Sequence, residues 1–74
     1  MNEQLINIVA GNIKKYRKKI DISQEELAER AGLHRTYIGG VERGERNITL
    51  DTLQTIANAL GIAPVELIVE ENDV

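Results

Sequence analysis

The chain has 74 residues, a mass of 8.3 kDa and no cysteine, so disulfides, thiolate zinc sites and a cysteine nucleophile are excluded. Hydrophobic residues make up 42% and charged residues 28%, which is typical of a globular domain rather than a disordered or fibrous chain. A chain this short buries only about 60% of its surface on folding, which leaves room for one core. No apolar run is long enough for a membrane span or a secretory signal. We therefore expect a single, soluble, cytoplasmic domain over residues 1–74.

Charge is unevenly distributed along the chain, although the net value is only −3. Residues 1–22 carry five cations against two carboxylates, and the cations are Lys14, Lys15, Arg17, Lys18 and Lys19. Residues 48–74 carry five carboxylates and no Lys or Arg. This asymmetry is compatible with one cationic face turned toward an anionic partner and an acidic pole turned away from it. A solvated, lysine-rich helix end is the simpler alternative.

The first two helices are predicted from an apolar stripe and from capping residues. An apolar stripe at helical spacing marks a first helix that ends near Lys19. The stripe consists of Leu5, Ile6, Val9, Ile13, Tyr16 and Ile20. A second helix starts after Ser23, whose hydroxyl can accept from the amide of Glu26 while that carboxylate reaches back. Gly32 ends this helix, because glycine accepts the left-handed conformation that other residues resist.

Three more short helices are predicted in the rest of the chain. Residues 34–43 form the third, which stops at Gly44. Thr49 caps the fourth, and Gly61 ends it. The apolar stripe of this fourth helix is Leu50, Leu53, Ile56, Ala57 and Leu60. Pro64 suits the first turn of a fifth helix over residues 63–70. No alternating strand pattern competes with these elements, so the predicted fold class is all-α, with five helices.

Residues 24–43 have the layout of a helix-turn-helix, the motif whose second helix enters the major groove of DNA. The small side chain of Ala28 lets the two helices cross closely, and Gly32 makes the sharp reversal between them. Ile38 and Val41 anchor the second helix in the core. The sequence therefore predicts that the third helix of the domain faces DNA.

The run SQEELAERAGLHRTYIGGVERGERN resembles the Cro/CI-type, or XRE, family of DNA-binding regulators, and the resemblance covers residues 12–69. Within that family, GLHRTYIGGVERGERNITL is most similar to the controller proteins of restriction-modification systems. The resemblance implies a five-helix, lambda-repressor-like domain that binds a palindromic operator in double-stranded DNA as a homodimer. It further implies a contact with RNA polymerase, and it implies neither a cofactor nor a metal.

Base-reading candidates lie in the first half and the middle of the third helix. Arg35 can donate two hydrogen bonds to one guanine, and Thr36 can offer its hydroxyl to a base or its methyl to thymine. Gly39 and Gly40 each cost ~1 kcal/mol relative to Ala inside a helix. They indicate either a close approach of the helix to DNA or a locally weak, bent helix. The predicted phosphate and sugar contacts are Gln24, His34, Tyr37, Arg43, Arg46 and Asn47.

Two further predictions concern structure and assembly. The resemblance implies a partly buried salt bridge between Arg17 and Glu42, which would join the first and third helices. For His34, the alternative to a phosphate contact is that its side chain caps the third helix. The apolar C-terminal segment carries no cation, and we expect it to form the dimer surface, although some of its residues must close the core of the monomer. This predicted surface consists of Ile62, Pro64, Val65, Leu67, Ile68 and Val69.

A homodimeric, sequence-specific transcriptional regulator is the function that these features favour. A phage-type repressor, an antitoxin autoregulator and a protein-interaction module that has lost DNA binding are the alternatives. The polar set of Arg35, Arg43, Arg46 and Asn47 argues against the interaction module. An enzyme has the least support, because GVERGERN lacks the Lys of a P-loop and the single His has no second metal ligand nearby.

Overall fold

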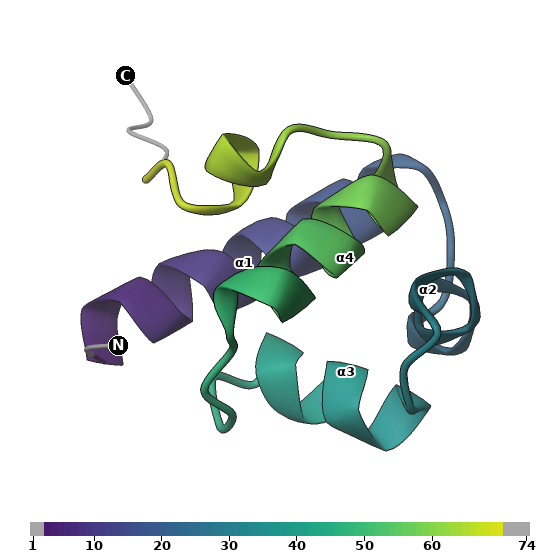
Figure 1. The fold of residues 1–74 in the computed structure, drawn as a ribbon, viewed down its shortest axis with the longest axis horizontal. Helices are drawn as coiled ribbons and strands as arrows, with labels where there is room; N and C mark the ends of the chain where they lie inside the picture. The colour runs from purple at the N-terminus through teal and green to yellow at the C-terminus, as the bar shows by residue number, and fades with distance from the viewer. Residues whose placement is uncertain (1–2, 71–74) are drawn as a thin grey trace.

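The computed structural model describes residues 3–70, so residues 1–2 and 71–74 of the predicted domain lie outside the described part. Its elements are α1 (Glu3–Lys19), α2 (Gln24–Ala31), α3 (Arg35–Glu42), α4 (Leu50–Leu60) and the 3₁₀ helix η1 (Pro64–Leu67). No strand occurs within residues 3–70, which confirms the all-α class. In Figure 1, α1 and α4 run through the middle of the domain, with α2 and α3 on one side and the C-terminal segment on the other. None of the helices described is both long and apolar enough to cross a membrane.

All five elements meet in one hydrophobic core. Each contributes a large aliphatic side chain with 0% exposure: Ile13, Leu27, Ile38, Ile56 and Leu67. Burying such a side chain stabilises a fold by about 1.5 to 3 kcal/mol. Because every element supplies one of these anchors, each short helix is held mainly by tertiary packing, which a helix of eight residues requires.

The predicted helix ends are confirmed at four places. The hydroxyl of Ser23 accepts a hydrogen bond from the amide of Glu26 at 3.0 Å, and that of Thr49 accepts from the amide of Thr52 at 3.1 Å. Gly32 and Gly61 end α2 and α4 with φ values of 67° and 74°. These residues satisfy backbone groups that a helix end leaves without partners, and they fix where the chain turns.

The predicted end of α1 near Lys19 is also confirmed, although no glycine marks it. Asp21 takes the left-handed conformation with φ 58°, which Asp and Asn tolerate better than most side chains. Its amide donates to the carbonyl of Lys18 at 3.0 Å, and the amide of Ile22 donates to that of Arg17 at 3.2 Å. Ile20, which the sequence placed on the apolar stripe, lies past the helix end and is 43% exposed.

Two details of the predicted elements are wrong. Leu50 is 84% exposed instead of buried, because it is the first residue of α4 and stands outside the core cluster. The carboxylate of Glu26 pairs with the guanidinium of Arg30 on the next turn of α2, so the structure gives it no return bond to the Ser23 cap. Both residues lie in the first turn of a helix, where the side chain can face solvent or pair with a residue of the next turn.

The prediction of a fifth α-helix over residues 63–70 is also wrong. The segment forms only the four-residue 3₁₀ helix η1. The reason lies in the side chain of Asn12, whose amide nitrogen donates to the carbonyls of Leu67 and Val69 at 2.9 Å each. These bonds tie the carbonyls to α1 instead of a following turn, and β-branched Val65 and Val69 favour helix weakly. Asn12 itself is buried, with 7% exposure.

We expect Asn12→Ala to lower the free energy of unfolding by about 1 to 3 kcal/mol, because it leaves the buried carbonyl of Leu67 without its donor. Chemical denaturation measures this change. The neighbouring Gly11 is exposed within α1 and has no atom within 4 Å of the place of an added Cβ, so Gly11→Ala should instead stabilise by about 0.5 to 1 kcal/mol. An Asn12→Ala protein as stable as the wild type would contradict the role assigned to this amide.

Candidate nucleic-acid interface

A buried ion pair joins α1 to α3 and fixes the orientation of the helix-turn-helix. Nε and Nη2 of Arg17 donate to Oε2 and Oε1 of Glu42 at 2.7 and 2.9 Å, a two-point contact. The two side chains are only 10% and 2% exposed. Nη1 of Arg17 donates to the carbonyl of Ile22 at 2.8 Å, and Nε2 of Gln24 donates to Oε1 of Glu42 at 3.1 Å. The structure thus confirms the Arg17–Glu42 pair and adds α2 to it.

The contacts of Arg17 shift the pKa of its guanidinium group. The hydrogen bond to Glu42 raises its pKa above the ordinary value, burial opposes the shift, and the negative charge of Glu42 adds to the rise. A group whose pKa is raised in the folded state stabilises the fold at all pH values below its unfolded pKa. The guanidinium of Arg17 therefore keeps its positive charge at neutral pH and loses it only under strongly alkaline conditions.

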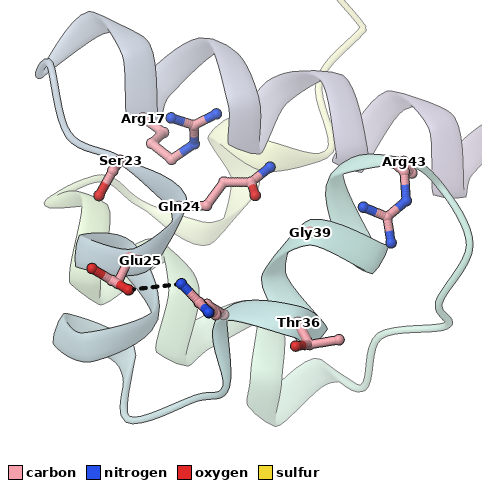
Figure 2. A pocket seen from close by; sticks show the side chains of 8 residues that line it. Arg17, Ser23, Gln24, Glu25, Thr36, Gly39 and Arg43 are labelled. Atoms are coloured by element: carbon pink, nitrogen blue, oxygen red, sulfur yellow. Dashed lines mark hydrogen bonds and ion pairs between the residues drawn. The ribbon is translucent and has the colours of Figure 1, made fainter.

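A shallow groove lies between α2 and α3, on the side of the pair that faces solvent. Its lining residues are Arg17, Ser23, Gln24, Glu25, Arg35, Thr36, Gly39 and Arg43. Figure 2 shows the N-terminal residues of α2 on one wall of this groove and α3 on the other. Backbone amides at a helix N-terminus attract anions, and Arg35 and Arg43 add positive charge beside them. The groove also contains the carboxylate of Glu25, and the amide of Gln24 already donates to Glu42, so the phosphate contact of Gln24 stays a prediction.

Arg35 forms an ion pair that no pattern in the sequence predicted. Its Nη1 donates to Oε2 of Glu25 across the groove at 3.0 Å (Figure 2). The two side chains are 72% and 71% exposed, so this pair stabilises the fold by at most about 1 kcal/mol. A contact this weak can exchange for a stronger one with a base. Glu25 belongs to the site, and its position ten residues before Arg35 gave no signal in the sequence.

Gly39 and Gly40 are both buried inside α3, which continues without a break from Arg35 to Glu42. The side chain of Arg43 lies over Gly39, and that of Arg46 lies over Gly40. The predicted close approach of these two glycines to DNA stays a prediction. In the structure, other side chains of the same chain occupy the space that the missing Cβ atoms leave.

The other predicted contact residues lie around α3. Thr36, Arg43, Arg46 and Asn47 are exposed, whereas Tyr37 is half-buried and packs against the core. Nε of Arg43 pairs with Oε1 of Glu45 at 3.1 Å. His34 occupies the cap position of α3, but its side chain makes no capping hydrogen bond, so the capping alternative is wrong. Within residues 3–70, no three His, Asp or Glu side chains gather as a metal site.

The sequence matches the family described as helix-turn-helix over residues 13–67. This chain belongs to the helix-turn-helix family. The control protein C.SmaI of Serratia marcescens is 52% identical over 64 residues, which are 86% of this chain and 76% of that protein. In a helix-turn-helix motif the second helix enters the major groove of DNA, and α2 and α3 have the layout of the two helices of that motif.

Two solved structures are similar to this helix-turn-helix chain along most of its length. The restriction-modification controller protein C.AhdI of Aeromonas hydrophila is 42% identical, with a TM-score of 0.82 over 84% of this chain and 94% of that one. The controller protein C.Esp1396I, solved as a tetramer in complex with its natural 35 base-pair operator, is 40% identical. Its TM-score is 0.80, over 85% of this chain and 83% of that one.

The C-terminal residues predicted to form the dimer surface divide into exposed and buried ones. Val65, Ile68 and Val69 are 54%, 43% and 51% exposed. Ile62 and Pro64 are half-buried, and Ile62 packs against the core. Leu67 has no exposed surface at all, so its assignment to the dimer surface is wrong: it anchors η1 in the core of the protomer.

We expect Arg17→Ala to lower the free energy of unfolding by about 3 to 5 kcal/mol, since it leaves the carboxylate of Glu42 buried without its charged partner. Urea denaturation measures the loss. Arg30→Ala is the matched control, because it removes an arginine from the exposed pair with Glu26 and should cost no more than about 0.5 kcal/mol. Equal small losses for both variants would show that the buried pair does not hold α3.

Proposed function

We propose that this chain is a transcriptional controller that binds operator DNA sequence-specifically as a homodimer, in the manner of the restriction-modification controllers to which it is similar. The observation that carries the proposal is the exposed side of α3, where Arg35 and Thr36 stand at the N-terminal end of the helix. In this family of motifs, that end of the second helix meets the base edges. The buried pair behind it supplies a rigid support, which base readout requires.

Cations around α3 suit this function in spite of the net charge of −3. Arg35, Arg43 and Arg46 are exposed in or just after α3. Arg35 and Arg43 would exchange their exposed ion pairs with Glu25 and Glu45 for contacts with bases or phosphates. Residues 48–70 carry only carboxylates as charged side chains. Such a distribution steers a duplex toward the arginines even though the whole chain is acidic.

We include a contact with RNA polymerase in the proposal, because a regulator bound at a promoter lies beside the polymerase. A cytoplasmic location follows from the same proposal, because that is where the DNA and the polymerase are.

Selection of bound sequences from a random pool of duplex DNA tests the proposed function directly. A homodimer with two recognition helices ~34 Å apart should enrich a palindrome whose half-site centres are about one helical turn apart. The selected site would also reveal whether more than one dimer occupies it. Failure to enrich any sequence at moderate ionic strength would favour the alternative, an interaction module that kept the fold without DNA binding.

Arg35→Ala should relax the preference at one base pair of each half-site and cost about 1 to 3 kcal/mol of specific binding, because it removes a two-point contact to guanine. Arg46→Ala should weaken binding evenly across sequences and lower the salt slope by about 1, as expected for the loss of a phosphate contact. Fluorescence anisotropy on the selected site and on single-base variants separates the two. An equal loss on specific and random DNA for Arg35→Ala would refute its assignment.

The dimer surface in this proposal consists of Val65, Ile68 and Val69. Val65 lies in η1 and the other two residues follow it; all three are exposed, and the same segment lacks any cation. A single domain of this size covers only one half-site, so two protomers are needed for useful affinity. An isologous contact between two copies of this segment would close a symmetric dimer with both α3 helices on one side.

Ile68→Asp should convert the protein to monomers and weaken operator binding strongly, because it places a charge in the apolar contact. Ile20→Asp is the matched control: Ile20 and Ile68 are both 43% exposed, but Ile20 lies in the turn after α1. Sedimentation velocity measures the oligomeric state. A dimer that persists in Ile68→Asp, or that is lost equally in Ile20→Asp, would remove the C-terminal segment from the interface.

A further inference from the structure

The turn that follows α3 sends the chain back along the same helix. Gly44 has φ 73°, its amide donates to the carbonyl of Val41 at 3.0 Å, and the amide of Glu45 donates to the carbonyl of Gly40 at 2.9 Å. This paired arrangement is a Schellman motif, in which a left-handed residue reverses the chain at a helix end. As a consequence, Arg46 lies beside α3 instead of beyond it.

The side chain of Arg46 then packs against Gly40. A Cβ atom at position 40 would lie 3.0 Å from Cγ of Arg46, 3.3 Å from Nε and 3.7 Å from Cδ. The first two distances are shorter than the 3.5 to 4.0 Å at which such atoms attract each other best, so an alanine would push the arginine away. Gly40 is buried, as expected if the arginine stem covers it.

Gly39 is related to Arg43 in the same way. A Cβ atom at position 39 would lie 3.2 Å from Nη1 of Arg43 and 3.5 Å from Oε1 of Gln24. The two adjacent glycines therefore accommodate two different arginines, one at the C-cap of the helix and one in the loop after it. Each glycine costs ~1 kcal/mol of helix stability relative to Ala, so their presence in an eight-residue helix needs a reason.

We propose that Gly40 is a positioning residue for DNA binding: its missing side chain forms a seat that holds the stem of Arg46 against α3 and so directs the guanidinium toward the DNA. This inference rests on the proposed function. Among the residues described, none forms an ion pair with Arg46, so packing against Gly40 and not a carboxylate restrains it. An arginine that is already held loses less conformational freedom on binding, which strengthens its contact.

The first test needs no DNA. Thermal unfolding is measured for Gly40→Ala in the wild-type and in the Arg46→Ala background, with Gly11→Ala in exposed α1 as the control for helix propensity. Gly11→Ala should raise Tm by roughly 2 to 8 °C in both backgrounds. Gly40→Ala should raise Tm less than this in the wild type and by about the full amount once Arg46 is removed. An equal rise in both backgrounds would show that no seat exists.

The second test is the same cycle measured on the selected operator. Gly40→Ala should lower affinity about threefold or more and reduce the salt slope, as a weaker form of Arg46→Ala. In the Arg46→Ala background, the same substitution should leave affinity unchanged. A loss that persists in that background would mean that the new Cβ meets the DNA itself, and no loss in either background would mean that Gly40 does not act on binding; both overturn the inference.

Gly39→Ala provides the matched comparison within α3. Its effect on affinity should persist in the Arg46→Ala background and disappear in the Arg43→Ala background, because Gly39 faces Arg43. Coupling of both glycines to both arginines would indicate a general disturbance of α3 and would overturn the specific assignment. If the wild-type protein enriched no DNA sequence, the proposed function would fail, whereas the thermal cycle would still decide whether the seat exists.

Discussion

The contact between Arg17 and Glu42 is the constraint on which the rest of the domain depends. The helix predicted to read DNA has only eight residues and two central glycines, so it cannot be stable by itself. Glu42 receives three hydrogen bonds, two from Arg17 on α1 and one from Gln24 on α2. A buried carboxylate is tolerated only when it is paired and bonded in this way, and meeting that requirement fixes α3 relative to both neighbours.

The residues that hold α3 in place are different from the residues proposed to contact DNA. The atoms that hold α3 are buried, whereas Arg35 and Thr36 are exposed on the same helix and their contacts can change without disturbing the fold. The weak pair between Arg35 and Glu25 fits this division, since both side chains are largely exposed.

Much of the fold could be predicted because local rules and the core pattern agreed. Ser23 and Thr49 mark helix starts, Gly32 and Gly61 mark helix ends, and the short-range chemistry that makes them caps is complete within four residues. The C-terminal segment was predicted less well. Its carbonyls bind Asn12, a residue more than fifty positions away, and no local pattern reports such a partner.

The sequence by itself determined the all-α class and most of the helix ends, because periodicity and caps are local properties. The family was indicated by the resemblance of one run of residues, which needs no tertiary structure to be seen. The tertiary structure alone decided which groups meet: Arg35 with Glu25, Asn12 with the end of η1, and two arginines with two glycines. It also decided that Leu67 belongs to the core and Leu50 to the surface. Such choices depend on how helices distant in sequence pack, and hydrophobicity alone does not distinguish a core position from an exposed one.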